Sequence, residues 1–357
     1  MRFLKKDFFV LVCLVFLIGI ELNVWTWLAM DWADKSWSAY GRVAFSITPL
    51  ILLPFGGFVS RIKYEKILLI VSFFVAFAAI SIHKKYHPAI HLSALFASGA
   101  ALHLMIFRSQ VLWSEFENSN KLLLNFSFAQ SASSMIAPGL AGLMIDNMKR
   151  ENMAIFVSFL SIIILLYIAI SKAKEMGKFS KKSIYSFLRK EEIKKELQRL
   201  YVGCKDDRLK RLNLDTVILS GSITAINVLI PILAINNGWP ATKAGLVLSF
   251  AGVASFFARF VLLKCRIQEK HERMLISIFS MIAVLSFISL IWVRNIDYAF
   301  ILAGLFGLAS GAAAPISLGM YSGYSKLIAD KSISWTMRSF FISITAIATP
   351  LLIGGLF

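Results

Sequence analysis

The stretch from Leu14 to Met30, "LVFLIGIELNVWTWLAM", is apolar except at Glu21 and Asn23. Such a run fits the interior of a membrane, because a helix needs about 20 apolar residues to cross the hydrocarbon. The whole chain has the same character: 58% of its residues are hydrophobic, 16% are charged and its mean hydropathy is +0.72. Soluble chains contain roughly 45–50% apolar residues even when Gly is counted. The sequence therefore predicts an all-α polytopic membrane protein.

Further apolar runs of about this length recur along the chain. They predict eleven transmembrane helices, at residues 8–30, 42–59, 67–83, 90–107, 122–145, 153–171, 214–235, 242–263, 274–293, 298–320 and 336–357. The first run follows three basic residues, as in a signal peptide, but it is too long for one, and no small-residue cleavage site precedes "DWADK". We therefore expect an uncleaved first span.

The net charge of +18 could suggest a nucleic-acid partner, but the distribution of the charges indicates a membrane topology. With the N-terminus in the cytoplasm, most of the 38 Lys and Arg residues fall in cytoplasmic loops, fourteen of them between residues 172 and 211. Basic residues concentrate on the cytoplasmic side of membrane proteins. We therefore expect a multi-pass protein of a bacterial inner membrane with a cytoplasmic N-terminus and no nucleic-acid partner.

Neither the cysteines nor the histidines predict a metal site or a cofactor. The three cysteines lie far apart in the sequence, which excludes a clustered disulfide or metal motif. The segment "HKKYHPAIH" spaces three histidines by four residues from His83 to His91, as one ligand face of a helix would, but Pro88 interrupts it. We expect a solvated loop there.

The spans divide around one long polar segment. Residues 1–171 form an N-terminal half of six helices, residues 172–213 a basic cytoplasmic linker, and residues 214–357 a C-terminal half of five helices. Within the linker, Ile193, Leu197 and Leu200 share a helical face, which predicts an amphipathic helix on the membrane surface.

An internal repeat relates the two halves. An offset of 212 residues superposes "SFAQSASSMIAPGLAGLMI" on "FFISITAIATPLLIGGLF", aligning Pro138 with Pro350 and Gly142 with Gly354. The fifth predicted helix therefore corresponds to the eleventh. The counterpart of the sixth would lie beyond the last residue, so we expect a 6+6 plan that lacks its last helix. Parallel six-helix repeats are a transporter architecture, with the substrate site between the halves.

After the second predicted helix, "GGFVSRIKYEK" resembles the loop motif G-x-x-x-D-R-x-G-R-R of the major facilitator superfamily. Gly57, Arg61 and Lys66 match the motif, whereas Ser60 replaces its acidic residue and Lys63 its second glycine. In that family the loop packs two helices closely and latches the cytoplasmic gate, so the missing acid weakens the expected latch.

In the fifth predicted helix, "SSMIAPGLAG" resembles the antiporter motif G-x-x-x-G-P-x-x-G-G, with Ala137, Pro138 and Gly142 in the small and proline positions. Small residues let membrane helices approach closely, and proline bends them. The segments "FRSQVLWSEFENSNKLLLNFSFAQ" and "PILAINNGWPATKAGLVLSFAGVASFF" are also similar to connections of the superfamily. The resemblance implies a major-facilitator-like bundle of the drug:proton antiporter type, on the siderophore- or macrolide-exporter branch.

Glu21 is the candidate proton carrier in this setting. It lies about 20 Å along the first predicted helix, within the hydrocarbon, where charged residues face cavities and mark ion or substrate pathways. Asn23 is the other polar residue of this run, and Trp25 shares the face of Glu21, suited to an amphiphilic or cationic cargo. The alternative is a protonated Glu21 hydrogen-bonded to a neighbouring helix. Trp27, Trp32 and Trp37 are interpreted as an interfacial belt.

Two other helices supply candidate pathway residues. In the seventh predicted helix, Ser220, Thr224, Asn227 and Pro231 share one face and predict a cavity-lining stripe, although such hydroxyls can instead bond their own backbone. His103 in the fourth could relay protons, but it lies nearer the cytoplasmic side than Glu21.

These observations predict a monomeric secondary transporter that exports an amphiphilic small molecule in exchange for protons by alternating access. A nutrient symporter on the same fold and a degenerate member without transport activity are the alternatives. An enzyme is not expected, because no nucleophile and base share a recognisable spacing and no phosphate-binding loop is present.

Overall fold

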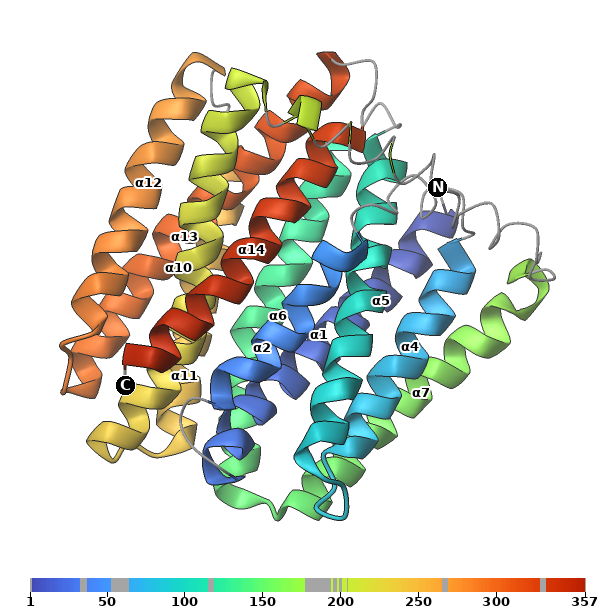
Figure 1. The fold of residues 1–357 in the computed structure, drawn as a ribbon, viewed down its shortest axis with the longest axis vertical. Helices are drawn as coiled ribbons and strands as arrows, with labels where there is room; N and C mark the ends of the chain where they lie inside the picture. Colours follow the sequence, from blue (N-terminus) through green and yellow to red (C-terminus); the bar gives the residue numbers. More distant parts are fainter. Residues whose placement is uncertain are drawn as a thin grey trace.

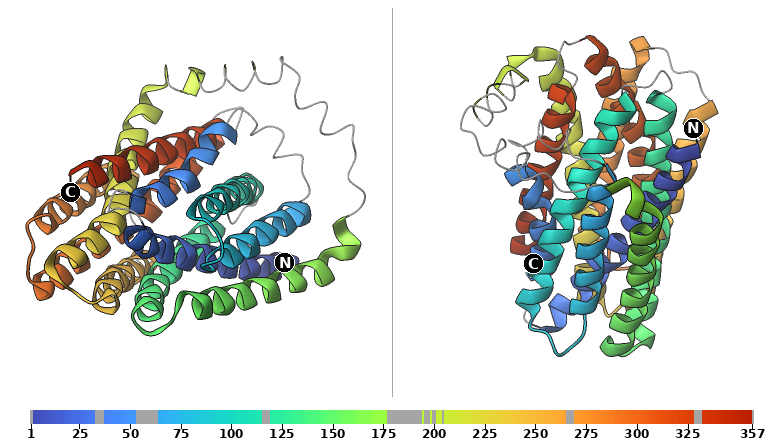
Figure 2. Two further views of the ribbon diagram at one scale, coloured as in Figure 1. Left: turned by 60° about the horizontal axis from the view of Figure 1, so that its bottom comes forward. Right: turned by 90° about the vertical axis from the view of Figure 1, so that its right-hand side faces the viewer.

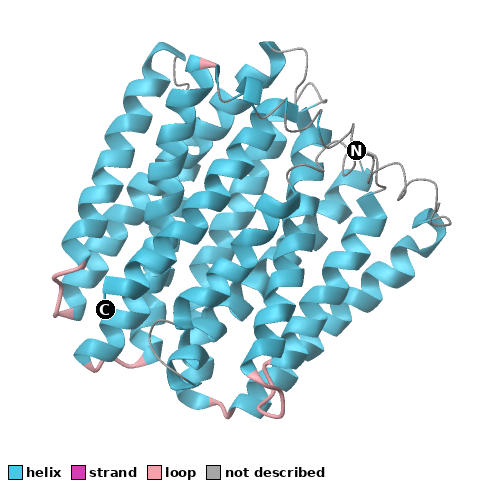
Figure 3. Cartoon of the chain, in the orientation of Figure 1, coloured by secondary structure: helices cyan, strands magenta, loops and turns pink. Residues whose placement is uncertain are grey.

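The computed structural model describes residues 2–32, 37–52, 64–114, 119–176, 194, 198, 201–203, 205–264, 269–327 and 332–356. These residues form helices joined by short turns and loops, and no strand occurs among them (Figure 3). The helices are α1 (Arg2–Trp32), α2 (Trp37–Leu52), α4 (Tyr64–Ser81), α5 (Pro88–Ser114), α6 (Ser119–Asn147), α7 (Arg150–Met176), α10 (Asp207–Asn237), α11 (Ala241–Lys264), α12 (Glu269–Leu290), α13 (Ile296–Leu327) and α14 (Ser332–Leu356). Each corresponds to one predicted span, which confirms the all-α fold class.

Seven of these helices contain a stretch long and apolar enough to cross a membrane, namely α1, α5, α7, α10, α11, α12 and α13. Shorter apolar stretches occupy Lys66–Ser81 in α4 and Met337–Ile353 in α14. Large apolar side chains cover the outside of the bundle; Ile155, Phe159 and Ile170 of α7 are 64%, 63% and 79% exposed. Soluble monomers rarely expose apolar surface on this scale. The chain is a multi-pass membrane protein.

Several helices extend beyond the predicted spans. Helix α10 begins at Asp207, so residues 207–213, which we expected in the linker, are helical. Helix α7 likewise continues to Met176. Hydropathy detects the apolar middle of a membrane helix, whereas its backbone hydrogen bonds continue into the polar interface. Residues 193, 197 and 200 of the expected amphipathic helix lie outside the described residues.

The helices form two groups. Figure 1 shows α1, α2 and α4 to α7 on one side of the bundle and α10 to α14 on the other. The same contacts recur in both groups: α6 packs on α1 as α14 packs on α10, and α2 packs on α5 as α11 packs on α13. The groups meet along two seams, α6 with α11 and α2 with α14 (Figure 2).

Close packing of α1 on α6 centres on Gly19. A side-chain carbon at Gly19 would lie 2.8 Å from Ser133 Oγ and 3.2 Å from Ala137 Cβ. The Ser133 hydroxyl also donates a hydrogen bond of 3.2 Å to the carbonyl of Val15. A residue larger than glycine at position 19 would require at least the Ser133 side chain to move.

Helix α10 packs on α14 in the same way at Gly221. A side-chain carbon there would lie 2.8 Å from Thr345 Cγ2 and 3.3 Å from Thr349 Oγ1. These two threonines follow their α6 counterparts by 212 positions, the offset of the sequence repeat. The repeat is therefore also present in the packing of the helices.

We call the end of the bundle at which α1 and α6 end and α11 begins, at the bottom of Figure 1, the far end. The interpretation of Trp27 as an interfacial residue is wrong, because it is 8% exposed and belongs to a buried cluster formed mainly by α10, α11 and α13. The end of α1 contacts the helix group formed by α10 to α14, and this group covers the indole ring of Trp27. The side chains of Trp32 and Trp37 lie outside the described residues.

Candidate functional site

Glu21 lies within α1 and is fully buried, with 0% of its surface exposed. Neither carboxyl oxygen has a hydrogen-bond partner among the described residues. A charged side chain at the centre of a membrane helix costs roughly 2.5–3.5 kcal/mol on insertion scales. Glu21 is thus a buried acid that no hydrogen bond within the described part of the chain compensates.

The packing around α1 shows which way Glu21 faces. Successive residues of an α-helix are rotated by about 100°, so Glu21 lies about 200° around α1 from Gly19, which faces α6. Trp25, one turn after Glu21, faces α2, where a side-chain carbon at Gly41 would lie 2.0 Å from Trp25 Cδ1. Glu21 therefore points away from α6, toward the α2 side of α1.

Asn23 and Trp25, both predicted pathway residues, are engaged in contacts in this conformation. The Asn23 amide donates a hydrogen bond of 2.7 Å to the carbonyl of Gly19 in its own helix. Trp25 is 0% exposed, and its ring stacks on His91 of α5 with centroids 5.2 Å apart and planes at 29°. Trp25 therefore fills the space between α1, α2 and α5.

His103 takes part in the contact between α5 and α2. Its Nδ1 lies 2.7 Å from the carbonyl oxygen of Gly99, and its ring centroid lies 5.1 Å from that of Phe45. No hydrogen bond joins His103 to Glu21, although the structure describes both residues. The structure thus does not bring the two candidate proton carriers together.

The histidines at the start of α5 have separate environments. His91 is buried, and its Nδ1 lies 2.5 Å from Ser81 Oγ and 3.1 Å from the carbonyl oxygen of Ala78. His87 is exposed and accepts a hydrogen bond from the N–H of Ala89. Among the residues that the structure describes, no group of three potential ligands could hold a metal ion.

The predicted stripe on α10 lies on one face of this helix. Ser220, Thr224 and Asn227 are half-buried, and Pro231 is buried within the helix. The Thr224 hydroxyl donates to the carbonyl of Ser220 at 2.8 Å, and the Asn227 amide donates to that of Ile223 at 2.7 Å. Two of the three polar side chains therefore bond the backbone of α10 itself.

Most of the loop motif after α2 lies outside the residues that the structure describes. Gly57 and Arg61 lie outside the described residues, whereas Lys66 lies in the first turn of α4 and is buried. In α14, Pro350 is buried within the helix and Gly354 lies near its end.

The small residues of α6 lie at the seam with α11, the most extensive helix contact of the described chain. A side-chain carbon at Gly142 would lie 2.4 Å from the carbonyl oxygen of Ala241, and one at Gly245 would lie 2.4 Å from that of Pro138. The N–H of Gly139 also donates to Ser249 Oγ at 2.9 Å. The backbones of the two helix groups therefore touch directly along this seam. Ala137 faces α1 instead.

Sequence reasoning missed Asp146, which ends this seam at the far end. Its carboxylate accepts the backbone N–H groups of Ala241 at 3.3 Å and Thr242 at 2.6 Å. These are the first residues of α11, whose N–H groups have no partner within the helix. An acid of one helix group therefore caps a helix of the other. A solvent-side Asp in sequence gives no signal of this role.

A polar cluster joins α10, α13 and α14 at the opposite end of the bundle. The Tyr321 hydroxyl donates to Asn213 Oδ1 at 2.5 Å and lies 3.2 Å from Thr216 Oγ1. Its ring stacks on Trp335 and lies 5.9 Å below the guanidinium of Arg338. These contacts hold three helices of the second group together.

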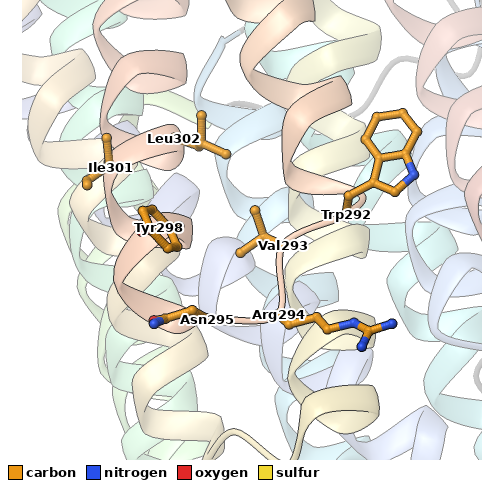
Figure 4. Close-up of a pocket in the computed structure, with 7 residues that line it drawn as sticks. All are labelled: Trp292, Val293, Arg294, Asn295, Tyr298, Ile301 and Leu302. Carbon is orange, nitrogen blue, oxygen red and sulfur yellow. The ribbon is translucent and has the colours of Figure 1, made fainter.

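A shallow pocket lies at the far end between α12 and α13, lined by Trp292, Arg294, Tyr298 and neighbouring residues (Figure 4). Trp292 and Tyr298 are 72% and 63% exposed. Exposed aromatic and basic residues at helix ends are typical of a membrane interface. The pocket belongs to one helix group alone and contains none of the predicted site residues.

Comparisons with known proteins place the fold. No protein-family model and no curated protein matches the chain. The human organic anion transporter MFSD10 (TETRAN) superposes with a TM-score of 0.65 at 14% identity, covering 97% of this chain and 92% of that one. A POT family transporter in complex with 5-aminolevulinic acid (TM-score 0.65) and one in complex with a thioalcohol-conjugated peptide (0.67) each superpose at 12% identity, covering 98% of this chain and 90% of theirs. The chain therefore shares the fold of these solved transporters, which agrees with the helical bundle that its motifs predicted.

Proposed function

We propose that this protein is a secondary transporter that exports an amphiphilic small molecule in exchange for protons. The fold that it shares with solved transporters supports transport. The antiporter-like motif in α6 supports export. The observation that carries proton coupling is Glu21, a fully buried carboxyl group without a hydrogen-bond partner among the described residues.

An unpartnered buried carboxyl group suits a proton carrier. Its neutral form is tolerated in an apolar interior, whereas its charged form requires water, a cation or a cargo. Alternating access would expose Glu21 first to one side of the membrane and then to the other. One proton could therefore be taken up on one side and released on the other in each cycle.

The seams supply the moving parts in this proposal. Residues 1–171 and 214–357 rock against each other along the contacts of α6 with α11 and of α2 with α14. The segment between α7 and α10 joins the two halves covalently. The concentration of Lys and Arg in alternate loops supports a cytoplasmic N-terminus in a bacterial inner membrane, as this proposal requires.

The test is flux driven by a pH gradient in proteoliposomes, with a panel of amphiphilic substrates. Glu21→Gln removes the charge and nearly conserves the size of the side chain, so the variant should fold but lose gradient-driven flux. Glu151→Gln is the matched control, because Glu151 pairs with Lys84 at the far end, away from the seams. Undiminished proton-coupled flux in Glu21→Gln would refute the assignment.

A proton-coupled symporter of solutes is the second candidate. It is favoured by the two POT family structures, whose bound molecules are 5-aminolevulinic acid and a conjugated peptide. The direction of flux under an imposed gradient separates the two: an exporter accumulates cargo against the proton flow, and a symporter moves it along with the protons.

A further inference from the structure

Arg42 in α2 is a half-buried basic residue whose guanidinium has enclosed donors without a partner among the described residues. Its Nε and Nη2 atoms are buried and have no hydrogen-bond partner among the described residues. Other described arginines have contacts: Arg150 Nε donates to the carbonyl of Ile82 at 2.6 Å, and Arg338 lies over the ring of Tyr321. A guanidinium stays protonated inside a protein, and a buried donor without a partner is costly, so the two enclosed nitrogens of Arg42 are left with unused N–H groups.

Arg42 does not point toward lipid. The exposed side of α2 is marked by Tyr40 and Ile47, which are 40% and 36% exposed. By the rotation of about 100° per residue, Arg42 lies about 200° from Tyr40 and about 140° from Ile47. Its neighbours in direction are Phe45, which contacts Gly99, and Ser46, which is 7% exposed. Arg42 therefore lies on the packed side of α2.

Helix α2 lies at a contact between the two helix groups. Helix α2 packs on α1 and α5 of its own group and on α14 of the other. Glu21 does not neutralise Arg42, because its two carboxyl oxygens have no described partner either. Two adjacent helices thus carry an acidic and a basic side chain that do not pair with each other in this conformation.

We propose that Arg42 binds an anionic group of the transported amphiphile, a carboxylate, phosphate or sulfonate. This inference rests on the proposed function and specifies the class of its cargo. The planar guanidinium offers a fork of N–H donors that matches two oxygens of such a group. The free Nε and Nη2 atoms are donors of this kind. The bound anion supplies the charge that the described chain does not.

The test is equilibrium binding of radiolabelled octanoate to the purified protein in phosphatidylcholine nanodiscs, with no gradient. Octyl phosphate and octanesulfonate should compete with octanoate, and octylammonium and octanol should not. Arg42→Gln should weaken octanoate binding by roughly 10- to 100-fold, the usual effect of losing charged hydrogen bonds. Arg42→Lys keeps the positive charge but loses the forked pair of N–H donors, so its octanoate affinity should lie between those of the wild-type protein and Arg42→Gln. Arg294→Gln, at an exposed position in the far-end loop, is the control.

Each of three results overturns the proposal. The first is wild-type protein that binds none of the three anions, and the second is unchanged octanoate affinity in Arg42→Gln. The third is displacement of octanoate by phosphatidylglycerol in the nanodisc. The last would assign the anion to a lipid headgroup. Should Arg42→Gln not fold, the comparison of Arg42→Lys with the wild-type protein decides. Arg42-dependent binding without flux in proteoliposomes would refute the proposed function and leave the anion site standing.

Discussion

Replacing Asp146 with alanine should make the far end of the seam between α6 and α11 open more often. The carboxylate caps the first turn of α11 only while the two helix groups are in contact there. Losing an N-cap costs about 0.5–2 kcal/mol, and losing a negative charge at a helix N-terminus costs about 0.3–1 kcal/mol. For an exposed carboxylate we take about 1–2 kcal/mol in total, which raises the open-to-closed ratio roughly 5- to 30-fold.

The assay is the rate at which a membrane-impermeant maleimide labels a cysteine behind the cap. Ala241 suits this purpose because it is 6% exposed at the start of α11 and alanine resembles cysteine in size. With Cys13, Cys204 and Cys265 replaced by serine, labelling of Ala241→Cys reports the open fraction even when that fraction is small. The rate should rise roughly 5- to 30-fold in Asp146→Ala. Asp146→Asn, which keeps an acceptor oxygen, should give a smaller rise.

The matched control is Asn147→Ala. The Asn147 amide donates only within α6, to the carbonyl of Leu143 at 2.9 Å, so its removal should leave the labelling rate unchanged. Equal labelling rates in Asp146→Ala and the parent protein, or an equal rise in Asn147→Ala, would refute the idea that this cap holds the seam closed.

Two further predictions concern the seam and the topology. Gly142→Leu should reduce flux per folded protein far more than Leu143→Ala. A side chain at Gly142 would meet the carbonyl of Ala241, whereas Leu143 is exposed. Equal flux of the two variants in proteoliposomes would show that this close contact is dispensable. An alkaline phosphatase reporter inserted after Lys149 should be active in bacterial cells, because a cytoplasmic N-terminus places the far end outside. A reporter inserted after Ser114, at the opposite end, should be inactive. The reverse pattern would show that the topology is inverted.

The helices could be predicted from the sequence because each membrane-spanning helix requires an apolar run of about 20 residues. Every predicted span corresponds to one helix, since a lipid-facing backbone must satisfy its own hydrogen bonds. The ends were less predictable. Helix α10 starts at Asp207 within the predicted linker, and its first turn is polar because it leaves the hydrocarbon. Hydropathy cannot locate a helix end whose hydrogen bonds persist in water.

The candidate site was predictable only where one residue carries the signal alone. Glu21 stands out as a lone acid in an apolar run, and the structure places it in full burial. Arg42 carried no such signal, because a basic residue at the edge of a span is ordinary. Thr224 and Asn227 share the predicted face, but their bonds to their own helix show that polarity on a face does not identify a ligand.

The repeat distinguishes the glycines that serve packing from Glu21, the proposed proton carrier. When Gly19 is aligned with Gly221, both glycines keep their close contacts, but Glu21 falls opposite Ile223. Packing is retained in both groups, whereas the position of Glu21 is apolar in the second group. If Glu21 serves transport, it costs stability, and Glu21→Ile should raise the melting temperature of the detergent-purified protein while abolishing proton coupling. If Glu21 were instead a structural hydrogen-bonding group, the same variant would melt at a lower temperature, and the proposed proton site would have to be sought elsewhere.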